Sequence, residues 1–176
     1  MGKITFILGG ARSGKSTYAL ELAKKHKDVA FIATCQGLDA EMKKRIKLHK
    51  ESRPRHWETF EEAKDVGLML AGMDNKFDCI VIDCLTLLVS NLLLAKVSHK
   101  TIEARIGRML EHLRKKEAQA IIVSNEVGLG LVPVNKLGRE FRDIAGKINQ
   151  IVASQADEVF FMASGLPCRI KGKGKV

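Results

Sequence analysis

Short apolar runs alternate with stretches of helical periodicity along this chain of 176 residues. Strand-like runs lie at residues 4–8, 29–33, 77–82, 118–124 and 157–163. Between them, apolar residues recur every three or four positions, as on the buried face of a helix. The clearest case is the set Ile102, Ile106, Met109, Leu110 and Leu113. Strands that alternate with helices predict an α/β fold with a mostly parallel sheet flanked by helices.

Five further helices are expected. They cover the stretch after Ser16, residues 39–52, 60–71 and 85–95, and a long segment from Pro133 to Ala153. Asp39 resembles an N-cap, and Pro54 disfavours the helical conformation at Arg53. Residues 85–95 are apolar on most faces, which indicates either a buried helix or an oligomer contact. After residue 163 only a short basic tail is expected. Without repeats or linkers, the pattern predicts one domain over residues 1–176.

Charge and cysteine content narrow the class of protein. The formal charge of +10 suits nucleic acid, a membrane surface or an anionic small substrate. Aromatic residues make up only 5%, which leaves little material for base stacking, so solvated helix faces are the preferred interpretation of the charge. Four cysteines without zinc or C-x-x-C spacing indicate reduced thiols. We therefore expect a cytoplasmic protein without membrane insertion.

The stretch after the first strand carries the strongest chemical signal. Its residues are Gly9, Gly10, Ala11, Arg12, Ser13, Gly14, Lys15 and Ser16. This order matches the phosphate-binding loop, in which two glycines enclose four residues and Lys-Ser follows. Successive backbone N–H groups at a helix N-terminus face an anion. Lys15 is expected to reach the β- and γ-phosphates, and Ser16 to hold Mg²⁺.

A carboxylate follows the apolar run that precedes the 85–95 helix. Asp83 ends the strand Cys-Ile-Val-Ile-Asp. In phosphate-loop folds a carboxylate at this place holds Mg²⁺ or its water. We therefore expect Asp83 and Ser16 to form the metal site.

A histidine lies between two cations on the helix expected from Asp39. Arg45, His49 and Arg53 are spaced four residues apart and so share one stripe. The cations favour a neutral imidazole, which could attack phosphorus and form a phosphoramidate. The alternative is an ordinary surface or packing histidine.

A glycine-rich segment, SNEVGLGLVP at residues 124–133, follows another strand, with Arg139, Arg142 and Asp143 after it. Ligands of α/β proteins lie at the carboxyl ends of strands. An ordinary loop next to a helix salt bridge explains the pattern equally well.

Together these segments resemble the family of bifunctional adenosylcobinamide kinases / adenosylcobinamide-phosphate guanylyltransferases. The specific stretches are GGARSGKS at residues 9–16, the segment with His49, Arg53 and Trp57, DCLT at 83–86, SNEVGLGLVP, and LGR-x-FRD at 137–143. They cover most of the chain in the family's order. Cys35 lies where the family often has alanine or serine.

The resemblance implies a two-step enzyme. Adenosylcobinamide first takes a phosphoryl group from ATP or GTP; a histidine, here His49, then attacks the α-phosphorus of GTP, and the cobinamide phosphate receives GMP. The implied nucleotide contacts outside the phosphate loop are Ala33, Thr34, Cys35, Lys50, Glu51, Ser52, Arg53, Glu61 and Asp83. A RecA-like sheet and a homotrimer are also implied. Because aromatic residues are few, no nucleic-acid partner is expected.

A single-activity guanylyltransferase is one alternative, and two other classes of protein are also considered. A simple small-molecule kinase would use Lys15 and Asp83 but would not need His49. A GTP-dependent switch or RNA-binding ATPase would explain the charge and predicts salt-sensitive nucleic-acid binding.

Overall fold

The computed structural model describes residues 1–37, 44, 50–51 and 53–173. These residues form a seven-stranded sheet in the order β3-β2-β4-β5-β1-β6-β7. The strands are β1 (Ile4–Gly9), β2 (Val29–Ala33), β3 (Glu58–Glu61), β4 (Cys79–Asp83), β5 (Gln119–Val123), β6 (Glu158–Ala163) and β7 (Leu166–Lys171). All neighbouring pairs are parallel except β6 and β7. The predicted mostly parallel α/β sheet is confirmed.

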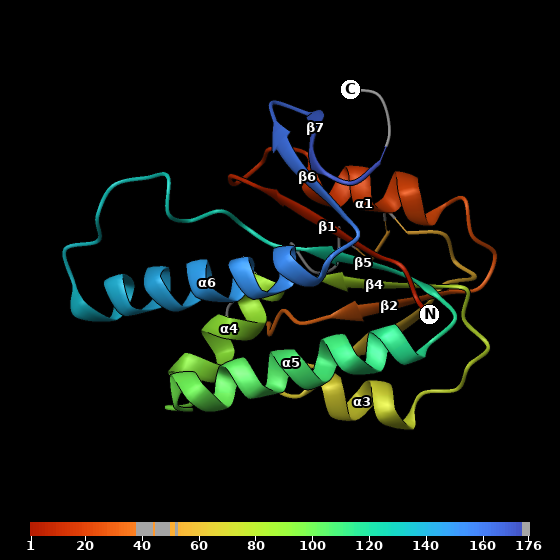
Figure 1. The fold of residues 1–176 in the computed structure, drawn as a ribbon, viewed down its shortest axis with the longest axis horizontal. Helices are drawn as coiled ribbons and strands as arrows, with labels where there is room; N and C mark the ends of the chain where they lie inside the picture. Colours follow the sequence, from red (N-terminus) through yellow and green to blue (C-terminus); the bar gives the residue numbers. More distant parts are fainter. Residues whose placement is uncertain (38–43, 45–49, 52, 174–176) are drawn as a thin grey trace.

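Helices cover both faces of the sheet (Figure 1). They are α1 (Lys15–Ala23), α3 (Val66–Gly72), α4 (Leu85–Leu94), α5 (His99–Lys115) and α6 (Lys136–Gln155). Helix α1 packs on one face, against Ile7, Phe31 and Val81. The other four pack on the opposite face, where Phe6 and Ile80 belong to the larger apolar cluster. Alternate residues of each strand therefore feed two cores.

Helix α4 belongs to the core of this chain. Leu85, Leu88, Val89 and Leu92 are at most 2% exposed. Of the two expectations for residues 85–95, the buried helix is confirmed. Among the described helices, none has the length and apolar character that crossing a bilayer requires.

Two predicted elements were wrong. The sequence pattern predicts a helix over residues 60–71 and no element at residues 58–59. Instead, residues 58–61 form β3, which pairs with the edge of β2. The helix begins only at Val66, where the Asp65 side chain accepts a hydrogen bond from Leu68 N at 3.1 Å. The basic tail also contains a strand, β7, which turns back on β6. The helix expected at residues 39–52 falls largely outside the described residues.

Candidate nucleotide-binding site

The phosphate loop connects β1 directly to α1, as predicted. Glycine is required at both ends of the loop. A Cβ at Gly9 would lie 2.6 Å from Met162 O, and Gly14 has a φ of +94°, a region that side chains rarely adopt. Ser13 N donates to Gly10 O at 3.3 Å, which closes the turn. The backbone thus forms a tight concave loop at a helix N-terminus, the arrangement that binds phosphate.

Lys15 lies within this loop. Lys15 is only 7% exposed, and its Nζ donates to Gly10 O at 2.5 Å and to Ser13 Oγ at 3.5 Å. The Lys15 ammonium thus lies beside the backbone of the loop at the N-terminus of α1, where it can form charge-assisted hydrogen bonds to a bound phosphate.

Strand register brings the predicted carboxylate to the same edge. Asp83 is level with Val123 of β5, and Val123 is level with Ile7 of β1, two residues before Gly9. One strand therefore separates the phosphate-loop strand from the strand that ends in Asp83. Ser16 and Asp83 are both half-buried. Their hydroxyl and carboxylate oxygens are ligand types that Mg²⁺ accepts.

The neighbouring strand β2 ends beside Asp83. Ala33 is level with Asp83, and Thr34 N donates to Asp83 O at 3.2 Å. The buried Thr34 hydroxyl donates to Cys84 O at 2.7 Å and accepts from Cys84 N at 2.9 Å. These bonds fix the backbone at positions 33–35, and Cys35 follows as a half-buried residue.

Arg53 joins the same edge. Its guanidinium lies 3.5 Å from the centroid of the Phe31 ring, and Nη1 donates to Thr59 Oγ1 at 3.3 Å. Burial lowers the pKa of Arg53, while the charges of Asp83 and Glu61 oppose that shift. Arg53, Asp83 and Glu61 therefore interact electrostatically at the carboxyl ends of β2, β3 and β4.

Several predicted site residues cannot be placed in this arrangement. His49, Ser52 and the flanking Arg45 lie outside the described residues. Lys50 and Glu51 are described and exposed. Within the described part of the chain, no group of three or more His, Cys, Asp or Glu side chains is arranged to hold a metal ion.

The turn between β6 and β7 supports the phosphate loop and was missed in the sequence. Gly165 N donates to Ser13 O at 3.0 Å, and a Cβ on Gly14 would lie 3.1 Å from Gly165 Cα. Ser164 and Gly165 both have positive φ, at 51° and 87°. The Ser-Gly pair directly after the strand-like run at residues 157–163 is the local turn signal for this position.

The glycine-rich segment after β5 also reaches the phosphate loop. Glu126 N donates to Gly9 O at 3.0 Å. Behind it, the Ser124 hydroxyl donates to Asn149 Oδ1 at 2.8 Å and pairs with the Thr86 hydroxyl at 2.9 Å. This buried network fixes the end of β5 against α4 and α6.

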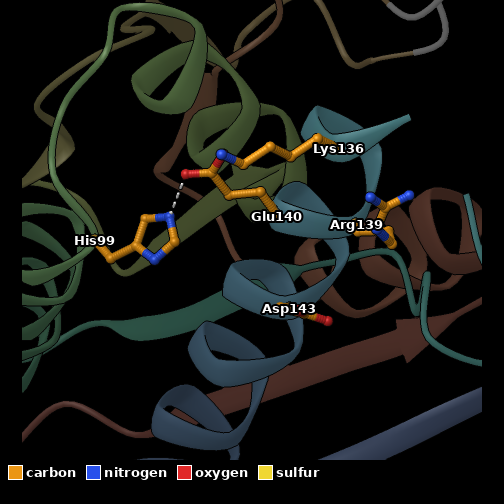
Figure 2. A pocket seen from close by; sticks show the side chains of 5 residues that line it. All are labelled: His99, Lys136, Arg139, Glu140 and Asp143. Carbon is orange, nitrogen blue, oxygen red and sulfur yellow. Dashed lines mark hydrogen bonds and ion pairs between the residues drawn. The ribbon is translucent and has the colours of Figure 1, made fainter. Parts of the chain in front are cut away.

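Further along, the first turns of α6 line an open cavity of about 520 Å³ (Figure 2). Its lining residues are His99, Lys136, Arg139, Glu140 and Asp143. His99 Nε2 and Glu140 Oε1 are 2.9 Å apart, joining α5 to α6. The helix salt bridge considered for this region is present, with Arg142 Nε 3.7 Å from Asp143 Oδ1.

Solved structures with similar folds support the architecture. The RadB recombinase superposes with a TM-score of 0.53 at 18% identity, covering 91% of this chain and 74% of that chain. A KaiC-like protein from Pyrococcus horikoshii gives 0.52 at 14% identity, covering 91% and 70%. The fold is therefore that of RecA-like phosphate-loop ATPases, as predicted.

Sequence comparisons identify the family. The protein "Bifunctional adenosylcobalamin biosynthesis protein CobU" of Salmonella typhimurium is 39% identical, over 94% of this chain and 98% of its own length. CobU of Escherichia coli is 37% identical over the same shares, and CobP of Pseudomonas aeruginosa is 41% identical over 95% and 96%. The family model described as cobinamide kinase / cobinamide phosphate guanyltransferase matches residues 5–170. The chain belongs to the cobinamide kinase / cobinamide phosphate guanyltransferase family.

Proposed function

We propose that this chain phosphorylates adenosylcobinamide with ATP or GTP and then converts the product to adenosylcobinamide-GDP. Family membership supports both reactions. The geometry that carries the proposal is the pairing of a phosphate loop holding the buried Lys15 with Asp83 at the same sheet edge.

In the kinase step, the loop N–H groups and Lys15 bind the β- and γ-phosphates and stabilise the charge that develops during transfer. The substrate hydroxyl oxygen forms a bond to the γ-phosphorus, the bond to the β–γ bridging oxygen breaks, and the hydroxyl proton is released. Ser16 and Asp83 would hold Mg²⁺, which neutralises phosphate charge.

In the guanylyl step, a nitrogen of His49 forms a bond to the α-phosphorus of GTP, and pyrophosphate leaves. A phosphate oxygen of the cobinamide phosphate then displaces the imidazole, which restores the histidine. The assignment of His49 rests on the family resemblance. It is supported by Arg53, four residues later, which lies beside Asp83 at the phosphate-loop edge.

The remaining nucleotide contacts are proposed at Ala33, Thr34, Cys35, Lys50, Glu51, Ser52 and Glu61. Ala33 and Glu61 are the last residues of β2 and β3, and Ala33 is paired with both Asp83 and Glu61 in the sheet. Thr34 and Cys35 follow β2, and Lys50 and Glu51 precede Arg53. We also propose that the chain acts as a single domain, as a homotrimer, in the cytoplasm, without nucleic-acid partners.

Product analysis tests the proposal. Wild-type protein, His49→Ala and the control His56→Ala are incubated with adenosylcobinamide, GTP and Mg²⁺, and corrinoid products are identified by mass spectrometry. His56 is exposed and lies beyond the end of the helix expected over residues 39–52. We expect the GDP product from the wild type and the control, and only the phosphate from His49→Ala.

Two outcomes favour the alternatives. A wild type that stops at the phosphate is a simple kinase. If no phosphorylated corrinoid forms, and the protein binds nucleic acid with an affinity that falls steeply with salt, the chain belongs to the nucleic-acid-binding class.

A further inference from the structure

Exposed apolar side chains are concentrated on one segment beside the nucleotide site. We define the apolar arm as residues 126–137, the loop after β5 and the start of α6. Five of the ten exposed large hydrophobic residues in the described chain belong to it: Leu129 (77% exposed), Leu131 (95%), Val132 (63%), Val134 (97%) and Leu137 (48%). A concentrated apolar surface of this kind indicates a binding site rather than chance exposure.

The arm is held in place at both ends. Glu126 N donates to Gly9 O of the phosphate loop at 3.0 Å. At the other end, Arg139 Nη1 donates to Pro133 O at 3.1 Å and to Val134 O at 2.5 Å. Asn135 caps α6 by accepting a hydrogen bond from Gly138 N at 2.6 Å. Hydrogen bonds therefore hold both ends of the apolar arm, while its apolar side chains are exposed.

The arm and the first half of α6 extend past the sheet edge. Asn149 Nδ2 donates to Asn125 O, so this part of α6 lies at the end of β5. Lys136 is thirteen residues earlier in the same helix, about 20 Å away at the rise of an α-helix. In Figure 1 the arm projects beyond the sheet together with this end of α6.

The open cavity lies beside the apolar arm, at the start of α6. Lys136 offers hydrogen-bond donors, and the carboxylates of Glu140 and Asp143 offer acceptors. Figure 2 shows Glu140 directed across to His99, with Lys136 beside it and Asp143 about one turn further along α6. The apolar arm and the cavity together thus combine apolar side chains with hydrogen-bond donors and acceptors.

We propose that the apolar arm and this cavity hold the corrinoid macrocycle of the substrate. The inference rests on the proposed function, because the substrate hydroxyl must reach the phosphate loop while the macrocycle remains outside it. A corrin ring carries methyl groups and neutral carboxamide arms that both donate and accept hydrogen bonds. The apolar arm, which begins at the phosphate loop, offers an apolar surface to the methyl groups, and the cavity offers hydrogen-bond donors and acceptors to the carboxamides.

Equilibrium dialysis with adenosylcobinamide tests the inference. The variant is Leu131→Ser/Val134→Ser, whose target side chains are at least 95% exposed and contribute little to folding. The matched control is Leu68→Ser/Ile170→Ser, two exposed apolar residues on α3 and β7. We expect corrinoid binding and the KM for the corrinoid to weaken roughly tenfold or more in the arm variant alone. The KM for ATP is expected to stay unchanged.

Two further measurements separate the possible failures. Unchanged corrinoid binding in the arm variant contradicts the inference while leaving the proposed function intact. A lower sedimentation mass of the arm variant, with normal corrinoid affinity per subunit, shows that the arm contacts a second copy of the chain and also overturns it. A wild type that neither binds nor phosphorylates adenosylcobinamide refutes the proposed function itself.

Discussion

At the scale of single residues, Lys15 is the group whose charge matters most in the described site. Its ammonium is buried against Gly10 O and Ser13 Oγ, so its position is set before nucleotide arrives. Pre-positioned charge of this kind needs no reorganisation during phosphoryl transfer.

We therefore expect Lys15→Ala to lower kcat/KM for corrinoid phosphorylation by about 10²–10³-fold. Lys24→Ala, an exposed lysine just after the same helix, serves as the control and is expected to match the wild type. Steady-state kinetics with ATP provide the measurement. Equal rates for the two variants would remove Lys15 from catalysis.

The cysteines make a second residue-scale prediction. Burial raises the pKa of Cys79 and of Cys84 to about 12, so both thiols stay protonated at pH 8. Cys168 is exposed. Alkylation of the native protein at pH 8, followed by peptide mass mapping, is expected to label Cys168 and to spare Cys79 and Cys84. Labelling of Cys84 before unfolding would contradict its described burial.

At the scale of elements, one carboxylate joins β1, α5 and β6. Asp157 accepts hydrogen bonds from Ile4 N and from Arg114 Nη1, each at 2.7 Å. Burial alone would raise the pKa of Asp157, but the bonds from Arg114 and Ile4 outweigh it and leave the pKa below its usual value. The ionised carboxylate is thus stabilised in the folded state.

A carboxylate whose pKa is lowered by folding stabilises the folded protein at pH values above its unfolded-state pKa, about 4. That contribution is lost as the pH falls through the pKa of the folded state. Asp157→Asn is expected to reduce the free energy of unfolding by about 1 kcal/mol at pH 7, a figure discounted because the side chain is 39% exposed. Urea titrations at pH 7 and pH 3 measure the difference, which should shrink at pH 3. Asp143→Asn, 71% exposed, is the control.

The same scale shows which elements could be predicted from sequence. Apolar runs such as residues 118–124 predict strands directly from sequence, because a parallel strand that is buried on both faces is almost continuously apolar. Strand β3 has four residues, of which the first and last are exposed, and its strand identity depends on the free edge of β2. Its alternation was too short to outweigh the helical pattern that follows. The N-cap Asp65 was a usable local signal for the true start of α3.

At the scale of the whole molecule, the parts of the site that are contiguous in sequence could be predicted, whereas contacts between residues far apart in the chain could not. The phosphate loop is contiguous, so its glycines, Lys15 and the flanking strand and helix were predicted together. The contact of Gly165 with Ser13, and of Arg53 with Phe31, joins residues far apart in the chain. Such contacts arise from strand order and could not be derived from periodicity. Asp83 was predicted because its place at a strand end is itself local.

The sheet order brings the proposed nucleotide contacts to one edge of the sheet. Strands β2, β4, β5 and β1 run parallel, so their carboxyl ends deliver Thr34, Asp83, Glu126 and the phosphate loop to one side. The apolar arm leaves from the same side. The proposed nucleotide site and the proposed corrinoid surface therefore lie next to each other, as sequential phosphoryl and guanylyl transfer to the same substrate arm requires.

The most direct test of guanylylation at His49 is the intact mass of the protein after incubation with Mg²⁺ and GTP. We predict a GMP-sized adduct that forms with GTP but not with ATP, is lost in acid and is absent from His49→Ala. The His56→Ala control should carry the adduct. An unmodified wild-type mass, or an adduct that persists in His49→Ala, would contradict guanylylation of His49 and leave a phosphate-loop kinase as the function of the chain.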